Sequence, residues 1–330
     1  MRRALPAALA AALAFGAPAA AAQRYADRTE VRQFIGEMAA QHGFAERALE
    51  RLFATVRTQD SVLTLIAPAP AGTRSWRAYR ANFVNARRIE AGVAFWRANA
   101  DTLARAAREV GVPPEIVVAI IGVETEYGRN TGTFRVLDAL ATLAFDQPRR
   151  AEYFRSELEQ YLLYARESGV DAAALRGSYA GAIGIPQFMP GSIRRFGVDY
   201  DGDGRRDLRA SRADAIGSVA NFLAAHGWVA GAPVAIAASV QGDGHRALVN
   251  GEVVPIHRPE VLREAGVEFA APVAPDAPCV LIELESPDAP PVHLVGLQNF
   301  YALTRYNRSS FYAAAVNDLA DEIKVARDAR

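Results

Sequence analysis

The 330-residue sequence has few of the features that mark redox, zinc-binding and nucleic-acid-binding proteins. Its one cysteine, Cys279, can form no intramolecular disulfide, and there is no C-x-x-C motif. Lys plus Arg and Asp plus Glu each total 37, and this balance argues against a polybasic nucleic-acid binder. The five histidines form no H-x-x-x-H pattern and no G-x-S-x-G motif occurs, which disfavours a zinc hydrolase and a serine hydrolase.

The composition indicates a folded protein. Hydrophobic residues make up 51% and charged residues 22% of the chain, which excludes a wholly disordered protein. The length suggests about two domains.

The N-terminus has the pattern of a secretory signal peptide. Arg2 and Arg3 precede an Ala/Leu-rich run that ends in small residues at Ala22. The run is too short and Ala-rich for a robust membrane span, and no cysteine near Ala22 marks a lipoprotein. We therefore expect residues 1–22 to be removed and the mature protein to be soluble.

Residues 23–110 have a helical pattern and are expected to form an N-terminal helical domain. Val31, Phe34, Ile35 and Met38 recur at the spacing of one helix face. A Pro/Gly-rich loop is expected at 68–72. The aromatic residues that follow at helical spacing favour a core position over a sugar-binding platform; these are Trp76, Tyr79 and Phe83.

Residues 111–229 are expected to form a second helical region, and 230–297 a small β subdomain. Four short β-prone runs fall in the latter, separated by Pro, Gly and Asp; they are 234–236, 252–254, 280–282 and 292–295. Residues 298–330 return to a helical pattern with a final helix over 309–326 and are expected to complete the helical core.

Glu124 is the candidate acid of the second helical region. The helix that begins at Pro113–Pro114 places its carboxyl beside Ile120 and Tyr127. Desolvation there favours the protonated form, as a general acid at neutral pH requires. The alternative is a structural ion pair with Arg129 or Arg135.

An Asp/Gly-rich segment, residues 199–207, has the spacing of a calcium loop. Asp199, Asp201 and Asp203 occupy positions 1, 3 and 5 of an EF-hand-like loop, and Arg205 would contribute its backbone carbonyl. The usual glutamate at position 12 is replaced by Ala210. A structural Ca²⁺ site is expected, with a solvated turn as the alternative.

An ordered series of motifs resembles the membrane-bound lytic murein transglycosylase B family, also classed as lytic transglycosylase family 3 and glycoside hydrolase family 103. The series runs from about Arg77 to the C-terminus, and its blocks are 121–132 (IGVETEYGRNTG), 138–145 (DALATLAF), 148–154 (PRRAEYF), 177–182 (GSYAGA), 187–190 (QFMP), 214–221 (DAIGSVAN), 299–301 (NFY) and 304–307 (TRYN). The resemblance covers most of the chain, and the order of the blocks makes it specific.

The resemblance implies a mainly α (α+β) fold: a lysozyme-like helical core with an N-terminal helical domain and a small inserted β subdomain. It implies a lytic transglycosylase, a lyase that cleaves the β-1,4 MurNAc–GlcNAc bond of peptidoglycan glycan strands without water and leaves 1,6-anhydroMurNAc ends. Glu124 would serve as both acid and base, with no cofactor for catalysis. Such an enzyme remodels the cell wall.

The resemblance also implies site residues. Ser178, Gln187, Tyr306, Asn307 and Tyr312 match substrate-binding positions, although both tyrosines would also suit a core. Asp214 matches the family's last calcium ligand, with one more residue in the intervening chain. Phe222 stands where the family commonly has tyrosine, so one hydroxyl contact is missing.

Two other functions compete with this interpretation. One is a lysozyme-type hydrolase in which water is the nucleophile, and the other is an inactive wall-binding scaffold. A monomer is expected, with no nucleic-acid partner, and cell-wall synthesis proteins are possible partners. The intact segment around Glu124 favours an enzyme.

Overall fold

The computed structural model describes residues 25–67, 74–251 and 253–329 of the chain. The expected signal peptide, 1–22, and the expected loop at 68–72 lie outside these residues. The chain divides into two compact units, Met1–Val56 and Arg57–Arg330. The expected boundaries near residues 110, 229 and 297 stay predictions.

From residue 25 onward, the first unit is built from a short 3₁₀ turn and two helices. These are η1 (Tyr25–Asp27), α1 (Thr29–His42) and α2 (Glu46–Phe53). The predicted apolar face of α1 is buried, with Phe34 and Met38 at its centre. The helix ends at Gly43, whose φ of 67° is a conformation that glycine adopts without strain.

The second unit holds the remaining helices, most of them in one helical body. In chain order they are α3 (Asp60–Leu65), α4 (Trp76–Phe83), α5 (Ala86–Ala98), α6 (Ala100–Val110), α7 (Pro114–Thr125), α8 (Val136–Phe145), η2 (Pro148–Arg150), α9 (Ala151–Ser168), α10 (Pro190–Phe196), α11 (Arg212–Ala225), η3 (Gly244–Leu248), α12 (Pro259–Glu264), α13 (Gln298–Tyr306) and α14 (Ser310–Asp328).

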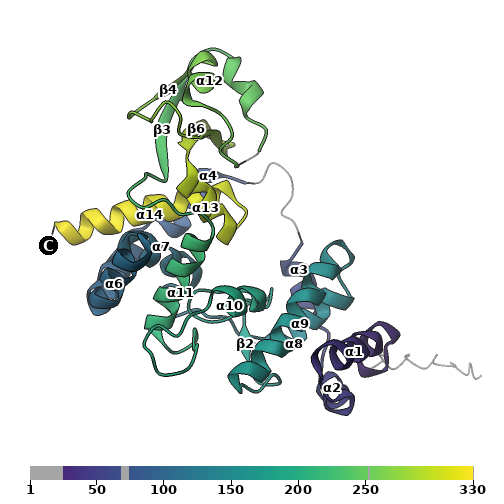
Figure 1. Cartoon of the computed structure of the whole chain (residues 1–330). Coiled ribbons are helices and arrows are strands. Elements are labelled where there is room, and N and C mark those ends of the chain that lie inside the picture. The colour runs from purple at the N-terminus through teal and green to yellow at the C-terminus, as the bar shows by residue number, and fades with distance from the viewer. Residues whose placement is uncertain (1–24, 68–73, 252, 330) are drawn as a thin grey trace, which may run out of the picture. The chain divides into compact units, whose positions relative to one another are not determined.

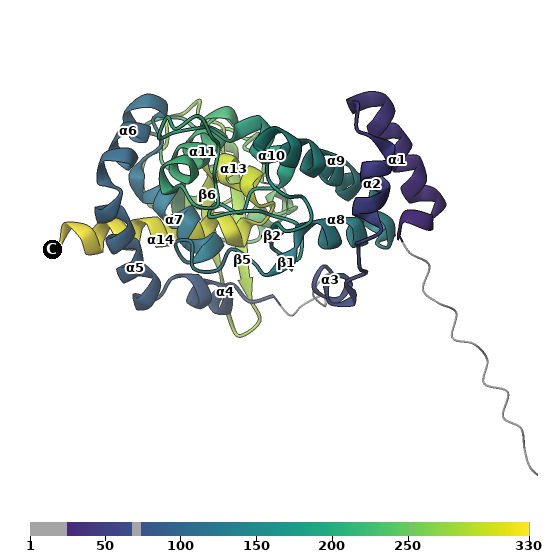
Figure 2. The same ribbon diagram turned by 90° about the horizontal axis from the view of Figure 1, so that it is seen from below.

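Helix α7 lies at the centre of this body. Its residues from Ile116 to Val123 are all buried, because α5, α6, α11 and α14 each pack against it. Figure 2 shows α5, α6, α7 and α14 gathered side by side. The C-terminal helix thus returns to the core, and Ser309 caps it by accepting a hydrogen bond from the backbone N–H of Tyr312.

Two small sheets lie among the described residues of the second unit. The two-stranded sheet pairs β1 (Phe134–Arg135) with β2 (Arg176–Gly177). The other, with η3 and α12, lies at one end of the unit (Figure 1). Its antiparallel order is β4-β3-β6-β5, and its strands are β3 (Ala235–Val240), β4 (Val267–Phe269), β5 (Val280–Ser286) and β6 (Ala289–Gly296).

The four-stranded sheet corrects one prediction. Residues 253–254 of the expected run at 252–254 form no strand, and Glu252 lies outside the described residues. Gly251 turns the chain with a φ of 78° and Pro255 follows closely, which leaves too short a stretch for strand pairing. The fourth strand is β4 instead. The mainly α fold with a small β part is confirmed.

Candidate active site

Glu124 lies at the end of α7, where the helix leaves the core. Its side chain is half-buried, and its Oε1 accepts a hydrogen bond of 2.7 Å from the hydroxyl of Tyr312. Tyr312 is itself buried in the first turn of α14. Packing of α14 against α7 therefore brings together two predicted site residues that are 188 positions apart in the sequence.

The surroundings of Glu124 favour its protonated form. Burial raises the pKa of Glu124 from 4.5 to about 7, and the hydrogen bond from Tyr312 opposes this rise because it stabilises the carboxylate. A carboxyl with a pKa near 7 is present in both its acid and its base form at neutral pH. Such a group can donate a proton in one step and accept one in the next.

A cluster of aromatic side chains lies beside Glu124. The ring of Tyr79 packs against Trp76, Phe83 and Phe311, with centroid distances of 6.5, 4.9 and 5.7 Å. Burial, and then the charge of Glu124, raises the pKa of Tyr79 to about 12. The sequence identified Tyr79 only as a core aromatic. Its half-exposed position and its interaction with Glu124 make it an additional site residue.

The chain turns sharply directly after Glu124. Glu126 and Tyr127 have φ values of 48° and 64°, a left-handed conformation that side chains other than glycine rarely adopt. The backbone N–H groups of Glu126 and Tyr127 donate to the carbonyls of Gly122 and Ile121, which closes the end of the helix. Two residues with strained backbone conformations therefore follow the candidate acid closely in the chain.

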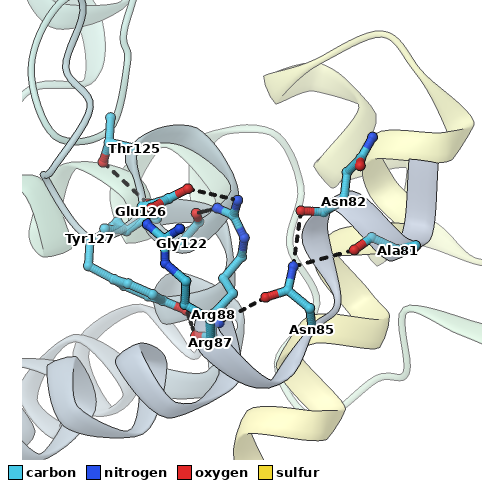
Figure 3. A network of polar contacts seen from close by, with 10 residues as sticks. Ala81, Asn82, Asn85, Arg87, Arg88, Gly122, Thr125, Glu126 and Tyr127 are labelled. Carbon is cyan, nitrogen blue, oxygen red and sulfur yellow. Dashed lines mark hydrogen bonds and ion pairs between the residues drawn. The ribbon is translucent and has the colours of Figure 1, made fainter. Parts of the chain in front are cut away.

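A polar network from α5 stabilises this turn (Figure 3). The carboxylate of Glu126 forms ion pairs of 2.6 Å with Arg87 and 3.4 Å with Arg88. Arg88 also donates to the carbonyl of Gly122, and its own carbonyl accepts a 2.8 Å hydrogen bond from the hydroxyl of Tyr127. The end of α7 is thus fastened to α5 through both charge and backbone contacts.

Two glycines make room for the Tyr127 ring. A Cβ at Gly92 or Gly122 would lie 2.6 or 2.5 Å from the Tyr127 hydroxyl oxygen, closer than real contacts allow. Because the ring lies between α5 and α7, both positions need the small residue.

The structural alternative for Glu124, an ion pair with Arg129 or Arg135, is wrong. Arg135 pairs instead with Asp138 at 2.9 Å, and its Nε donates to a backbone carbonyl. Arg129 is exposed. The pKa of Glu124 is shifted by burial and by the hydrogen bond from Tyr312, and neither arginine is among the causes.

Two of the predicted substrate-binding residues, Tyr306 and Asn307, line a cavity of about 700 Å³. The ring of Tyr306 stacks on Tyr312 at 6.2 Å, which connects the cavity to the tyrosine that contacts Glu124. Phe222 also lines the cavity and packs edge-on against Tyr306 at 4.9 Å. Burial and the charge of Glu124 raise the pKa of Tyr306 well above its ordinary value.

Ser178 and Gln187 lie in the loops between α9 and α10. The hydroxyl oxygen of Ser178 accepts hydrogen bonds from the backbone N–H groups of Ala180 and Ala182 at 3.3 and 3.0 Å. The amide of Gln187 donates to the carbonyls of Thr131 and Gly184 at 3.1 and 2.8 Å. Both side chains organise their own loops, and no hydrogen bond joins either to Glu124 among the described residues.

The Asp/Gly-rich segment forms a compact acidic loop. Oxygens of Asp199, Asp201 and Asp203 lie within 4.8 Å of one another. The carboxylate of Asp199 accepts backbone N–H groups of Gly202 and Gly204, each at 2.8 Å. Clustered carboxylate oxygens suit Ca²⁺, which prefers such ligands, so the residues fit this ion.

Asp214 has a different position from these three. It is buried at the start of α11, and its two oxygens accept the backbone N–H groups of Tyr200 and Asp207, each at 2.7 Å. It lies outside the group whose oxygens are within 4.8 Å. Asp214 thus stabilises the loop through hydrogen bonds to its backbone. The roles of Asp214 and of the Arg205 carbonyl as metal ligands stay predictions.

None of the helices in the described part of the chain has both the length and the apolar composition needed to cross a membrane.

The sequence matches a known family model and a curated relative. The model of the transglycosylase SLT domain matches residues 26–321. The membrane-bound lytic murein transglycosylase B of Escherichia coli is 43% identical over 312 residues, which cover 92% of this chain and 85% of the relative.

Solved structures agree with these matches. The catenated lytic transglycosylase SltB1 of Pseudomonas aeruginosa has a TM-score of 0.87 at 45% identity and covers 92% of this chain and 99% of its own. The structure of the Escherichia coli lytic transglycosylase Slt35 in complex with calcium has a TM-score of 0.82 at 43% identity. The match covers 90% of this chain and 93% of the Slt35 chain. The structure of Pseudomonas aeruginosa SltB3 in complex with NAG-anhNAM-pentapeptide has a TM-score of 0.77 at 31% identity. The match covers 89% of this chain and 79% of the SltB3 chain. The chain therefore belongs to the transglycosylase SLT domain family and is a lytic transglycosylase.

Proposed function

We propose that this lytic transglycosylase cleaves the β-1,4 bond between MurNAc and GlcNAc in peptidoglycan, with Glu124 as its only acid and base. The observation that carries the proposal is the environment of Glu124: desolvation raises its pKa to about 7, and the hydroxyl of Tyr312 holds its Oε1 at 2.7 Å. The NAG-anhNAM-pentapeptide bound by SltB3 supports the same substrate and product class.

The reaction begins with Glu124 protonated. Its proton passes to the glycosidic oxygen, the bond from that oxygen to C1 of MurNAc breaks, and GlcNAc leaves with a new hydroxyl. The carboxylate that remains accepts a hydrogen bond from Tyr312. It then takes the proton of the C6 hydroxyl of the same MurNAc, while the C6 oxygen bonds to C1. The 1,6-anhydro ring forms, and Glu124 is protonated again.

One carboxyl is enough for this sequence. Glycosidases that use water or form a covalent intermediate place a second carboxylate across the bond. The nearby Glu126 does not serve in this way, because its carboxylate is paired with Arg87 and Arg88. The substrate's own acetamido carbonyl is expected to stabilise the positive charge at C1 instead.

The remaining predicted residues have binding roles in this proposal. Tyr306 and Asn307 line the 700 Å³ cavity, which suits sugar rings against an aromatic wall and an amide. The carbonyl of Gln187 accepts from an N-acetyl group, while its amide nitrogen is used within its loop. Ser178 shapes the loop that follows β2.

Asp199, Asp201 and Asp203 hold Ca²⁺ in this proposal, with the carbonyl of Arg205 and with Asp214 as further ligands. The calcium complex of Slt35 supports the assignment. The ion would stabilise the loop before α11 and take no part in catalysis.

The mature enzyme is proposed to act as a monomer in the periplasm, after removal of residues 1–22. Peptidoglycan strands are its substrate there, and proteins of cell-wall synthesis are proposed partners.

Mass spectrometry of the products from purified sacculi tests the function. A lytic transglycosylase releases muropeptides that are lighter by one water than the products of a lysozyme-type hydrolase. Release of hydrolysed products would favour the hydrolase, and no release by the folded protein would favour the scaffold.

A further inference from the structure

A group of three metal-ligating side chains lies in the β part of the second unit, away from the proposed substrate and calcium sites. His245 belongs to η3, Glu283 to β5 and His293 to β6. One ligand atom from each lies within 4.8 Å of the others. Glu283 and His293 face each other directly across the strand pair, and the Nε2 of His293 lies 2.9 Å from the Oε2 of Glu283.

This group occupies the core side of the sheet. Leu281 and Val295 are the neighbouring pair on the same face, and both belong to the buried core of the β part. His245 and His293 are each only 8% exposed, and their rings meet edge to face at 5.4 Å. Polar side chains in such a place need partners, because burial removes their hydrogen bonds to water.

One of these polar atoms has no partner. The Nδ1 of His245 is buried and makes no hydrogen bond among the described residues. Leaving a buried ring nitrogen unpaired costs about 1–3 kcal/mol. His245 also offers one ring nitrogen to the group with Glu283 and His293, and a cation bound through Nδ1 would remove this cost.

We propose that His245, Glu283 and His293 bind a zinc ion. Two neutral imidazoles and one carboxylate are a ligand set that Zn²⁺ accepts, with water as the fourth ligand. Around a tetrahedral zinc ion the ligand atoms are about 3.3 Å apart, since each bond is about 2.0–2.1 Å long. Side-chain rotation closes the group from its present spread, and the ion then replaces the bond between His293 and Glu283.

The role of this zinc ion is structural. It would join η3 to β5 and β6 in a subdomain whose buried core has six residues; these are Leu262, Val267, Cys279, Leu281, Val295 and Leu297. Cores of this size often depend on a metal ion or on disulfides, and a lone cysteine cannot supply a disulfide here.

Zinc titration of the chelator-treated full-length mature protein, with calcium held in excess to occupy the acidic loop, tests the site. We expect one zinc ion per chain and a rise in melting temperature on zinc addition. His245→Ala removes a side chain whose buried Nδ1 makes no hydrogen bond among the described residues, so the variant should fold. It should bind zinc at least about 10-fold more weakly, the effect of disturbing even an outer ligand partner.

Two further variants complete the experiment. Glu283→Gln can keep the hydrogen bond to His293 but loses the carboxylate, so it should also weaken zinc binding. His257→Ala changes a half-buried histidine of the same subdomain outside the group and should bind zinc like the wild type. The proposal is overturned if the wild type shows no saturable zinc binding in the micromolar range. It is equally overturned if His245→Ala and Glu283→Gln bind zinc as tightly as the wild type.

Discussion

Glu124 and the acidic loop carry the same functional group in opposite surroundings. Burial raises the pKa of Glu124 to about 7, whereas the hydroxyl of Ser211, 2.6 Å from the exposed Asp201, keeps the pKa of that carboxyl below its ordinary value. The first carboxyl exchanges protons near neutral pH, and the second stays charged and attracts cations. Desolvation and hydrogen bonding thus determine which chemistry a carboxyl performs.

The largest effect is expected when the carboxyl of Glu124 is replaced by a group that cannot exchange protons. Glu124→Gln keeps the size of the side chain but can neither donate nor accept a proton in catalysis. General acid–base catalysis contributes about 10²–10⁴-fold, and two transfers depend on this group, so activity should fall by about 10⁴-fold or more. Release of anhydromuropeptides from sacculi measures the loss.

The control for this variant follows from the contacts. Glu126→Gln is a poor control, because the Glu126 carboxylate pairs with Arg87 and Arg88 at the strained turn. Glu115→Gln is the better control, because Glu115 lies in the first turn of the same helix and pairs only with Lys324 among the described residues. Near wild-type activity of folded Glu124→Gln would contradict the assignment.

The stability of the protein should also depend on the proton of Glu124. Its pKa is 4.5 ordinarily and about 7 when folded, so between these pH values the folded state binds more protons than the unfolded state. The free energy of unfolding should therefore fall as pH rises through this window, by at most about 3 kcal/mol, and by less where solvent reaches the carboxyl.

Urea unfolding of the wild type and of Glu124→Gln, below pH 4.5 and above pH 7, measures this dependence. The variant should gain stability relative to the wild type at the higher pH, because it has no charge to bury. A difference between the two proteins that does not change with pH would show that burial of Glu124 carries no such penalty.

Removal of calcium should lower the stability of the protein through the acidic loop at 199–203, away from Glu124. At a free calcium concentration of 100 times Kd, binding stabilises the folded state by about 2.7 kcal/mol, so a chelator should lower the melting temperature by several degrees. Asp199→Asn combined with Asp203→Asn should abolish the response, whereas Asp276→Asn, at an exposed loop position, should keep it. Identical melting curves of the wild type with and without chelator would exclude the calcium site.

The smallest expected effect is a shift in the pKa of Glu124. Tyr312→Phe removes the hydroxyl that stabilises the carboxylate, so the pKa of Glu124 should rise. A hydrogen bond to a charged group is worth about 1.5–3 kcal/mol, which corresponds to about 1–2 pH units. The basic limb of the pH–activity profile should move to higher pH by this amount.

Tyr161→Phe is the matched control for this shift. It removes another buried tyrosine hydroxyl, which donates to the carbonyl of Ala172 at 2.7 Å, and should lower stability without moving the profile. An unchanged profile in Tyr312→Phe would mean that the hydroxyl does not tune the acid.

The sequence predicted what depends on local pattern. The apolar run predicts the buried helix that carries Glu124, and the Asp/Gly spacing predicts the loop at 199–203. The expected helical contact of Glu124 with Tyr127 is wrong, because α7 ends at Thr125 and Tyr127 lies in the left-handed turn beyond it. The contact between Glu124 and Tyr312 spans 188 residues, so no local pattern contains it, and only the family resemblance pointed to Tyr312.

Other features of the molecule depend on packing alone. The left-handed turn at Glu126 is not visible in its residue type, because its stability comes from Arg87 and Arg88 on another helix. The histidines at 245 and 293 have no metal-binding spacing, and only the pairing of β5 with β6 and the position of η3 bring them together.

The fastened end of α7 has a consequence for hydrogen exchange. Helix termini normally fray, so their amides exchange through small local openings. Here the amides of Glu126 and Tyr127 donate to helix carbonyls, while Arg88 and the Tyr127 hydroxyl join the same turn to α5. Exposure of these amides requires α5 to separate from α7. The turn that follows Glu124 therefore opens together with the packing of α5 on α7 rather than by itself.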